Sequence, residues 1–123
     1  MVYLVIGIGG ILGANARYWV TGWAAQRFGT VFPYGTFIIN VSGAIFLGFL
    51  MAFLQDRAFI HPNYRLFFAT GFCGAYTTFS TFTYESLVLL QNGSFLLAFV
   101  NLFGSLLVGM VGVFLGFLIG KLI

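Results

Sequence analysis

Residues 66–90 have the sequence LFFATGFCGAYTTFSTFTYESLVLL, an apolar run as long as one membrane span with polar residues at its centre. The polar residues surround the midpoint near Thr78, and Gly71 and Gly74 precede them. Because glycine and threonine both disfavour helix, one interpretation is a helix broken at Gly74–Thr78. Its freed backbone groups would then be buried in protein or face a wet cavity. The other interpretation is a continuous helix whose hydroxyls bond to carbonyls four residues earlier, and composition leaves both open.

The composition of the whole chain is that of a membrane protein. Of its 123 residues, 61% are hydrophobic and 6% are charged, whereas a soluble domain has about 25% charged residues. The mean hydropathy of +1.07 agrees. These values exclude a soluble enzyme, a nucleic-acid-binding module and a disordered tail. The Lys and Arg residues are scattered singly and form no basic patch, and the lone Cys73 predicts neither a disulfide nor a metal cluster.

The apolar runs together predict an all-α integral membrane protein, with four transmembrane helices in one domain, 1–123. The predicted spans are 2–23, 33–54, 66–90 and 95–123. The connectors are Gln26–Phe32, the polar stretch Gln55–Arg65 and the turn Gln91–Ser94. A membrane barrel is not indicated, because each run exceeds the barrel-strand length of about 10 residues and lacks alternating polarity.

The distribution of cations gives this arrangement little preferred orientation. Both termini and the second connector are expected on one side of the membrane. The cations on that side are Arg57, Arg65 and Lys121, and those on the other side are Arg27 and Arg17. The positive-inside rule depends on such differences, and this one is small. One hypothesis is therefore an antiparallel, dual-topology homodimer, and the alternative is a unit with both termini inside.

Small residues recur at intervals of four in the first and fourth spans. They are Gly9 and Gly13 in the first span, and Gly112, Gly116 and Gly120 in the fourth. Small residues at this spacing allow helix backbones to approach closely in lipid. The pattern therefore predicts tight helix packing, but it does not indicate what the protein carries.

Polar side chains also recur at helical spacing in two spans. Thr36 and Asn40 lie four residues apart in the second span, as do Asn101 and Ser105 in the fourth. In lipid such stripes are expected to face partner helices or water. They either join helices by hydrogen bonds, which is common, or line a pathway.

Phe79 and Phe82 favour the pathway, and they indicate an anion. The edges of their rings are weakly positive and, with amide and hydroxyl donors, suit a small dehydrated anion. The alternative is that both rings simply face lipid or pack, as most of the 17 Phe residues in this chain are expected to do. Arg17 could act as a vestibule cation or extend to the membrane surface, and Glu85 follows about two turns after the possible break. A catalytic triad, paired carboxylates and a phosphate-binding loop are all absent from the sequence, which therefore does not indicate an enzyme.

Three segments of the chain resemble the Fluc (CrcB) family of fluoride ion channels, and the resemblance extends over the whole chain. The segments are GGILGANARY at 9–18, GTFIINVSG at 35–43, and GFCGAYTTFSTF at 71–82, followed by Glu85. The resemblance implies an antiparallel dimer with two pores and a third helix broken at mid-membrane. It also implies a central sodium ion held by the main-chain carbonyls of Gly74 and Thr77.

The resemblance further implies which residues line the fluoride path. Asn40, Phe79, Phe82 and Ser80 match family positions, with Arg17 in a vestibule and Glu85 beyond the phenylalanines. Some relatives carry Tyr where Asn101 stands. The full set of predicted path residues is Thr36, Asn40, Phe79, Ser80, Phe82, Asn101, Ser105, Arg17 and Glu85.

The leading hypothesis is thus a passive channel that exports cytoplasmic fluoride across the inner membrane of a prokaryote. Fluoride, the lipid bilayer and a second copy of the chain are the expected partners. One alternative is a small proton-coupled multidrug transporter, which needs a carboxylate in its first span, where this chain has Arg17 and no acidic residue. Another is a non-transporting assembly subunit held together by glycine packing.

Overall fold

The computed structural model describes residues 1–55 and 57–123, and Asp56, in the predicted second connector, lies outside them. The described residues form helices and no strand, as predicted. In chain order the elements are α1 (Val2–Phe28), α2 (Tyr34–Gln55), α3 (Pro62–Arg65), the π-helical η1 (Leu66–Cys73), α4 (Gly74–Tyr76), α5 (Phe79–Gln91), α6 (Phe95–Phe99), the π-helical η2 (Val100–Gly104) and α7 (Ser105–Leu122). They group into four helical segments, one for each predicted span.

The helix ends differ from the predicted spans mainly after the first segment. Gln26 and Arg27 were predicted to lie in a connector, but α1 includes both and continues to Phe28. Gly29 ends the helix because its φ of 83° lies in the left-handed region that glycine adopts readily. Polar residues alone therefore did not end α1, and the connector is shorter than predicted. Gly93, with φ 76°, forms the turn between α5 and α6 where a turn was predicted.

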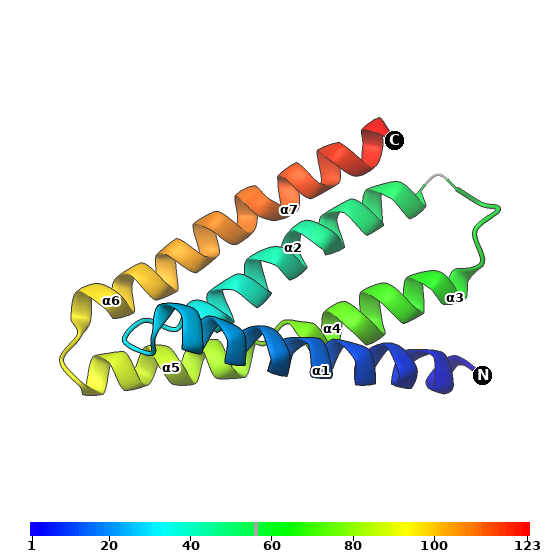
Figure 1. Cartoon of the computed structure of the whole chain (residues 1–123). Coiled ribbons are helices and arrows are strands. Elements are labelled where there is room, and N and C mark those ends of the chain that lie inside the picture. The colour runs from blue at the N-terminus through cyan, green and yellow to red at the C-terminus, as the bar shows by residue number, and fades with distance from the viewer. Residues whose placement is uncertain (56) are drawn as a thin grey trace.

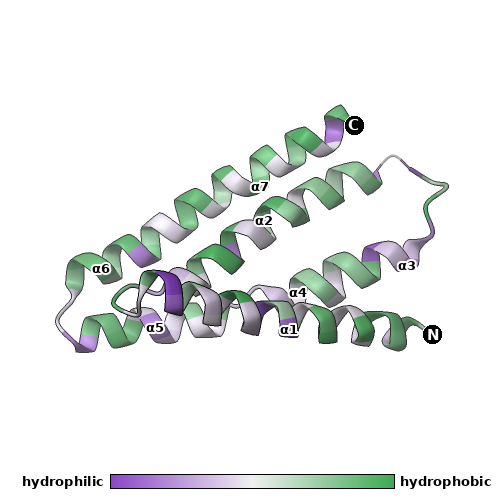
Figure 2. Ribbon diagram, viewed as in Figure 1, coloured by the Kyte–Doolittle hydropathy of each residue, from purple (hydrophilic) through white to green (hydrophobic). Residues whose placement is uncertain are grey.

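The four segments lie side by side, and the two termini and α3 lie at the same end of the molecule (Figure 1). This arrangement agrees with the prediction that both termini share one side. The largest packing contacts join α2 to α7 and α1 to η1. Among the described residues, Tyr34–Gln55 and Phe95–Leu122 are the two helices long and apolar enough to span a membrane. Figure 2 shows mostly hydrophobic colour along α2 and α7, interrupted by paler and purple turns.

Glycines make both of the main helix contacts possible, as their spacing predicted. A Cβ on Gly9 or Gly13 would overlap the carbonyl oxygens of Phe67 and Phe72 in η1. In the same way, Gly116 in α7 lies directly against the carbonyl of Ile45 in α2. All three glycines are buried. The small-residue stripes are therefore surfaces where one backbone rests on another.

Gly116→Ala is expected to lower the melting temperature of the detergent-purified protein by about 5 °C or more. The new Cβ would meet the backbone of Ile45, which cannot rotate away as a side chain can. Gly109→Ala, in the same helix, is the matched control, because a Cβ there would meet nothing within 4 Å. Alanine also favours helix over glycine, so the control should be as stable as the wild type or more so. Equal melting temperatures for the two variants would contradict the tight α2–α7 contact.

Candidate ion-conduction site

The third helical segment is interrupted at Thr77 and Thr78. Thr77 has φ −82° and ψ 159°, and Thr78 has φ −150° and ψ 123°, so both residues are extended. The prediction of a break is confirmed, although the break is shorter than Gly74–Thr78. Gly74 itself remains helical, with φ −60° and ψ −32°. The two consecutive threonines, and not the glycine, therefore carry the break.

Asn40 of α2 holds the break through its side-chain amide. Its Nδ2 donates to the Thr78 carbonyl oxygen at 3.0 Å, and its Oδ1 accepts from the Thr78 N–H at 2.8 Å. The amide thus satisfies both the N–H and the carbonyl of Thr78. The Thr78 hydroxyl caps α5 by accepting from the Thr81 N–H at 3.2 Å. Because an unpaired backbone group is costly in lipid, this pairing makes an interrupted segment tolerable there.

These hydrogen bonds release two carbonyl oxygens. In a continuous helix the Thr78 N–H would donate to the Gly74 carbonyl, and the Thr81 N–H to the Thr77 carbonyl. Here those N–H groups donate instead to Asn40 Oδ1 and to the Thr78 hydroxyl. Gly74 is also exposed on the surface of the chain. These two neutral carbonyls no longer accept a helical hydrogen bond. As oxygen ligands they suit a small hard cation such as sodium.

Two cavities lie on either side of this break. The first, the Arg17 cavity, has a volume of about 670 Å³ and is enclosed by α1, the α1–α2 connector, α2 and α5. Its polar lining includes Arg17, Thr36, Thr81, Tyr84 and Glu85. The second, the phenylalanine cavity, has a volume of about 450 Å³ and lies between α2, α5 and α7. It is lined by Asn40, Thr77, Phe79, Phe82, Ser105 and apolar residues of α2 and α7, and Thr78 lines both cavities.

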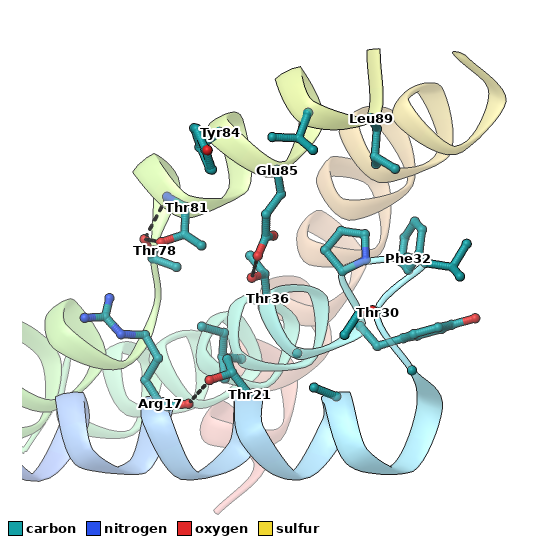
Figure 3. Close-up of a pocket in the computed structure, with 18 of the residues that line it drawn as sticks. Arg17, Thr21, Thr30, Phe32, Thr36, Thr78, Thr81, Tyr84, Glu85 and Leu89 are labelled. Carbon is teal, nitrogen blue, oxygen red and sulfur yellow. Dashed lines mark hydrogen bonds between the residues drawn. The ribbon is translucent and has the colours of Figure 1, made fainter. Parts of the chain in front are cut away.

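The Arg17 cavity contains a carboxylate that is only half satisfied. Glu85 points from α5 toward α2, where the Thr36 hydroxyl donates to Oε1 at 2.9 Å (Figure 3). Oε2 is buried and has no hydrogen-bond partner among the described residues. Arg17 extends from α1 toward the start of α5 in the same view. The cavity therefore presents a cation, a carboxylate oxygen and hydroxyls to any ion that enters it.

The phenylalanine cavity is largely apolar and open at the surface of the chain. The rings of Phe79 and Phe82 lie 6.2 Å apart between centroids, with an angle of 49° between their planes. Phe79 is 78% exposed, whereas Phe82 is half-buried. The Asn40 amide and the Ser105 hydroxyl line the same cavity. Two aromatic rings and neutral polar groups thus line one space.

The chain also matches known proteins over almost its whole length. Residues 4–117 match the family model described as CrcB-like protein, Camphor Resistance (CrcB). The chain belongs to the CrcB family. It is 46% identical over 121 residues to the Fluoride-specific ion channel FluC of Acidobacterium capsulatum, covering 98% of this chain and 97% of that protein. It is 45% identical over 118 residues to the protein of the same name from Chloroflexus aurantiacus, covering 96% and 94%.

The structure of this CrcB chain divides the predicted path residues into three groups. Arg17, Thr36 and Glu85 line the Arg17 cavity. Asn40, Phe79, Phe82 and Ser105 line the phenylalanine cavity. Ser80 and Asn101 line neither of the two cavities. Ser80 is exposed, and its hydroxyl lies 3.4 Å from that of Thr78, whereas Asn101 is fully buried.

Three residues that support the site in this CrcB chain are missing from the predicted set. Thr78 caps α5, and its position three residues before Thr81 is a recognisable capping spacing. Tyr76 lies 3.0 Å from the Ser42 hydroxyl of α2, which holds α4 to α2 just before the break. Ser86 accepts a hydrogen bond from Asn101 at 2.9 Å. Neither of these two contacts has a local sequence signal, because each joins distant parts of the chain.

Proposed function

We propose that this protein is a passive, fluoride-selective channel that exports fluoride across the inner membrane of a prokaryote. The observation that carries the proposal is the break at Thr77–Thr78, held open by Asn40 beside the rings of Phe79 and Phe82. The curated relatives that match nearly the full chain are named fluoride-specific ion channels. Conduction needs no catalytic group.

Fluoride selectivity follows from the chemistry of the lining. Fluoride holds its water strongly, so a path must replace that water with good donors. The Asn40 amide has a second N–H besides the one donated to Thr78, whereas the Ser105 hydroxyl, which lines the same cavity, donates to Asn101. The ring edges of Phe79 and Phe82 add weakly positive surface without the tight binding that a full cationic charge would cause. Chloride is larger and accepts weaker hydrogen bonds, so the same lining replaces less of its hydration energy.

The released carbonyls of Gly74 and Thr77 would hold a sodium ion at the break. Bound there, sodium would supply a fixed positive charge that lowers the electrostatic barrier to a nearby anion. Asn40 and the Thr78 hydroxyl would keep these carbonyls available, because they accept the N–H groups that would bond to the carbonyls in a continuous helix.

The assembly in this proposal is an antiparallel homodimer of four-span subunits. Phe79 is 78% exposed, although it lines the proposed path, so a second copy is needed to complete the path around it. Only 11% of the most apolar stretch of the helix Phe95–Leu122 is buried within the chain. This leaves a wide face of the helix for contact with lipid and a partner subunit. The cations also give the subunit little preferred orientation in the membrane, because three at one end (Arg57, Arg65 and Lys121) are opposed by two toward the other (Arg17 and Arg27).

Purified protein in liposomes is expected to release trapped fluoride, with valinomycin present to balance charge by potassium movement. Trapped chloride should leave no faster than from empty liposomes, and an imposed proton gradient should not change the fluoride rate. Fluoride flux driven by the proton gradient would instead indicate a coupled carrier, and no flux at all would refute the channel.

For topology, a single cysteine added at the C-terminus of a cysteine-free variant should be labelled from both sides of the membrane. Labelling from one side alone would contradict the antiparallel dimer.

A further inference from the structure

A buried chain of hydrogen bonds connects the fourth helical segment to α5. Asn101, in η2, is 0% exposed, and its Nδ2 donates to the Ser86 hydroxyl at 2.9 Å. The Ser105 hydroxyl lies 3.4 Å from Asn101 Oδ1 and donates to it. Ser86 is itself 3% exposed, and its hydroxyl donates to the Phe82 carbonyl at 2.8 Å. The chain of bonds therefore ends on the backbone of a residue whose ring lines the phenylalanine cavity.

The directions of these bonds assign each group one role. Ser86 has a single hydroxyl proton, and the Phe82 carbonyl takes it. Ser86 can therefore only accept from its other neighbour, which must be the Asn101 amide nitrogen. This orientation leaves Asn101 Oδ1 facing Ser105 as an acceptor. Every polar atom of the Asn101 side chain is thus engaged inside the protein, away from both cavities.

Asn101 also lies where few other contacts connect these two segments. In the part of the chain that the structure describes, its bond to Ser86 is the only side-chain hydrogen bond joining α5 to the fourth segment. Asn101 lies within the π-helical turn Val100–Gly104, and such turns frequently mark functional positions in helices. At Phe79, α5 begins directly after the extended residue Thr78, so no continuous helix fixes its rotation from that side. The rotation of α5 therefore depends on contacts made by residues later in the helix.

We infer that Asn101 and Ser86 are positioning residues for the fluoride path, because their bond, with the Thr36–Glu85 bond to α2, fixes the rotation of α5 and hence the place of the Phe82 ring. The inference rests on the proposed function. It gives Asn101 a role that differs from lining the path, since the residue is fully buried, lines neither cavity, and bonds to Ser86 and Ser105 through the two polar atoms of its amide. A small rotation of α5 would move Phe82 relative to Asn40 and Ser105, which line the same cavity from other helices.

Ser86→Ala is the discriminating variant, because Ser86 lines neither cavity. We expect Ser86→Ala and Asn101→Leu each to lower the fluoride rate per folded protein about tenfold. The double variant should be no slower than the slower single variant, because both changes remove the same hydrogen bond, from Asn101 to Ser86. Thr83→Val is the matched control, because the Thr83 hydroxyl donates only to carbonyls of its own helix, and it should keep the wild-type rate. Ser86→Cys, which is nearly the same size, keeps the measurement possible if alanine impairs folding.

A second background separates positioning from general damage. In Phe82→Ile protein, Ser86→Ala should slow fluoride by less than twofold, because the ring that it positions is already gone. A full tenfold loss in that background, at equal melting temperature, would show a structural role only. Loss in Asn101→Leu with none in Ser86→Ala would overturn the inference and return Asn101 to the path. Wild-type fluoride flux serves as the reference throughout, so failure of the proposed function would appear there and not in the variants.

Discussion

Asn40→Asp is expected to slow fluoride efflux from liposomes roughly 100-fold or more. The carboxylate can still accept from the Thr78 N–H, but it has no proton for the Thr78 carbonyl, which Nδ2 contacts at 3.0 Å. Leaving a buried carbonyl unpaired costs about 1–3 kcal/mol, and each 1.4 kcal/mol is about tenfold in an equilibrium. Two oxygens would also repel each other there, and a negative charge beside the path would oppose an anion. The measurement is the initial fluoride rate from liposomes at equal protein content.

Asn63→Asp is the matched control for the same change of charge and shape. Asn63 lies in α3, near the N-terminal end of a short helix, and it lines neither the Arg17 cavity nor the phenylalanine cavity. An acidic residue in a first helical turn is well tolerated, so its flux should stay within about twofold of the wild type. Wild-type flux from correctly folded Asn40→Asp protein would contradict the assignment of Asn40 to the break.

Phe79→Ile and Phe82→Ile are each expected to slow fluoride efflux about tenfold, while chloride stays excluded. Isoleucine keeps an apolar side chain of useful bulk but has no positive ring edge. The two rings lie 6.2 Å apart in the same cavity as the Asn40 amide, so each ring can contact an ion that leaves its water there. The expected loss corresponds to about 1.4 kcal/mol of stabilisation per ring. Fluoride and chloride rates measured side by side check both parts.

Phe95→Ile tests whether any exposed phenylalanine matters equally. Phe95 is 68% exposed at the start of α6 and lines neither cavity. Its replacement should leave the fluoride rate unchanged. If Phe95→Ile slowed the flux as much as Phe79→Ile, the effect would belong to general packing in the membrane and not to the ring edges.

Local patterns were sufficient to predict the helical segments and their closest contacts. Apolar length predicted four segments, and glycine spacing predicted the surfaces where Gly9, Gly13 and Gly116 meet another backbone. Each of these features depends on residues that are neighbours along one helix. The end of α1 was misplaced, because Gln26 and Arg27 are polar but helical, and only Gly29 has the backbone freedom to end the helix.

The site depended on partners far apart in the sequence, and there composition was ambiguous. Whether residues 66–90 break could not be decided locally, because the group that satisfies Thr78 is the amide of Asn40, which lies in another helix. The stripe of Asn101 and Ser105 predicted a polar face, but its spacing could not reveal that Ser86 would take up the Asn101 amide. Pattern thus identified most of the polar residues of the site, and tertiary contacts assign their hydrogen bonds.

The dependence of the break on α2 also gives this protein an order of assembly during synthesis. Asn40 precedes Thr78 in the chain, so the helix that carries the amide is synthesised before the third segment. Until α2 and the third segment meet, an uninterrupted helix has the lower free energy for that segment, because it pairs its backbone groups internally. The extended link between α4 and α5 is therefore expected to form only when this segment docks on α2.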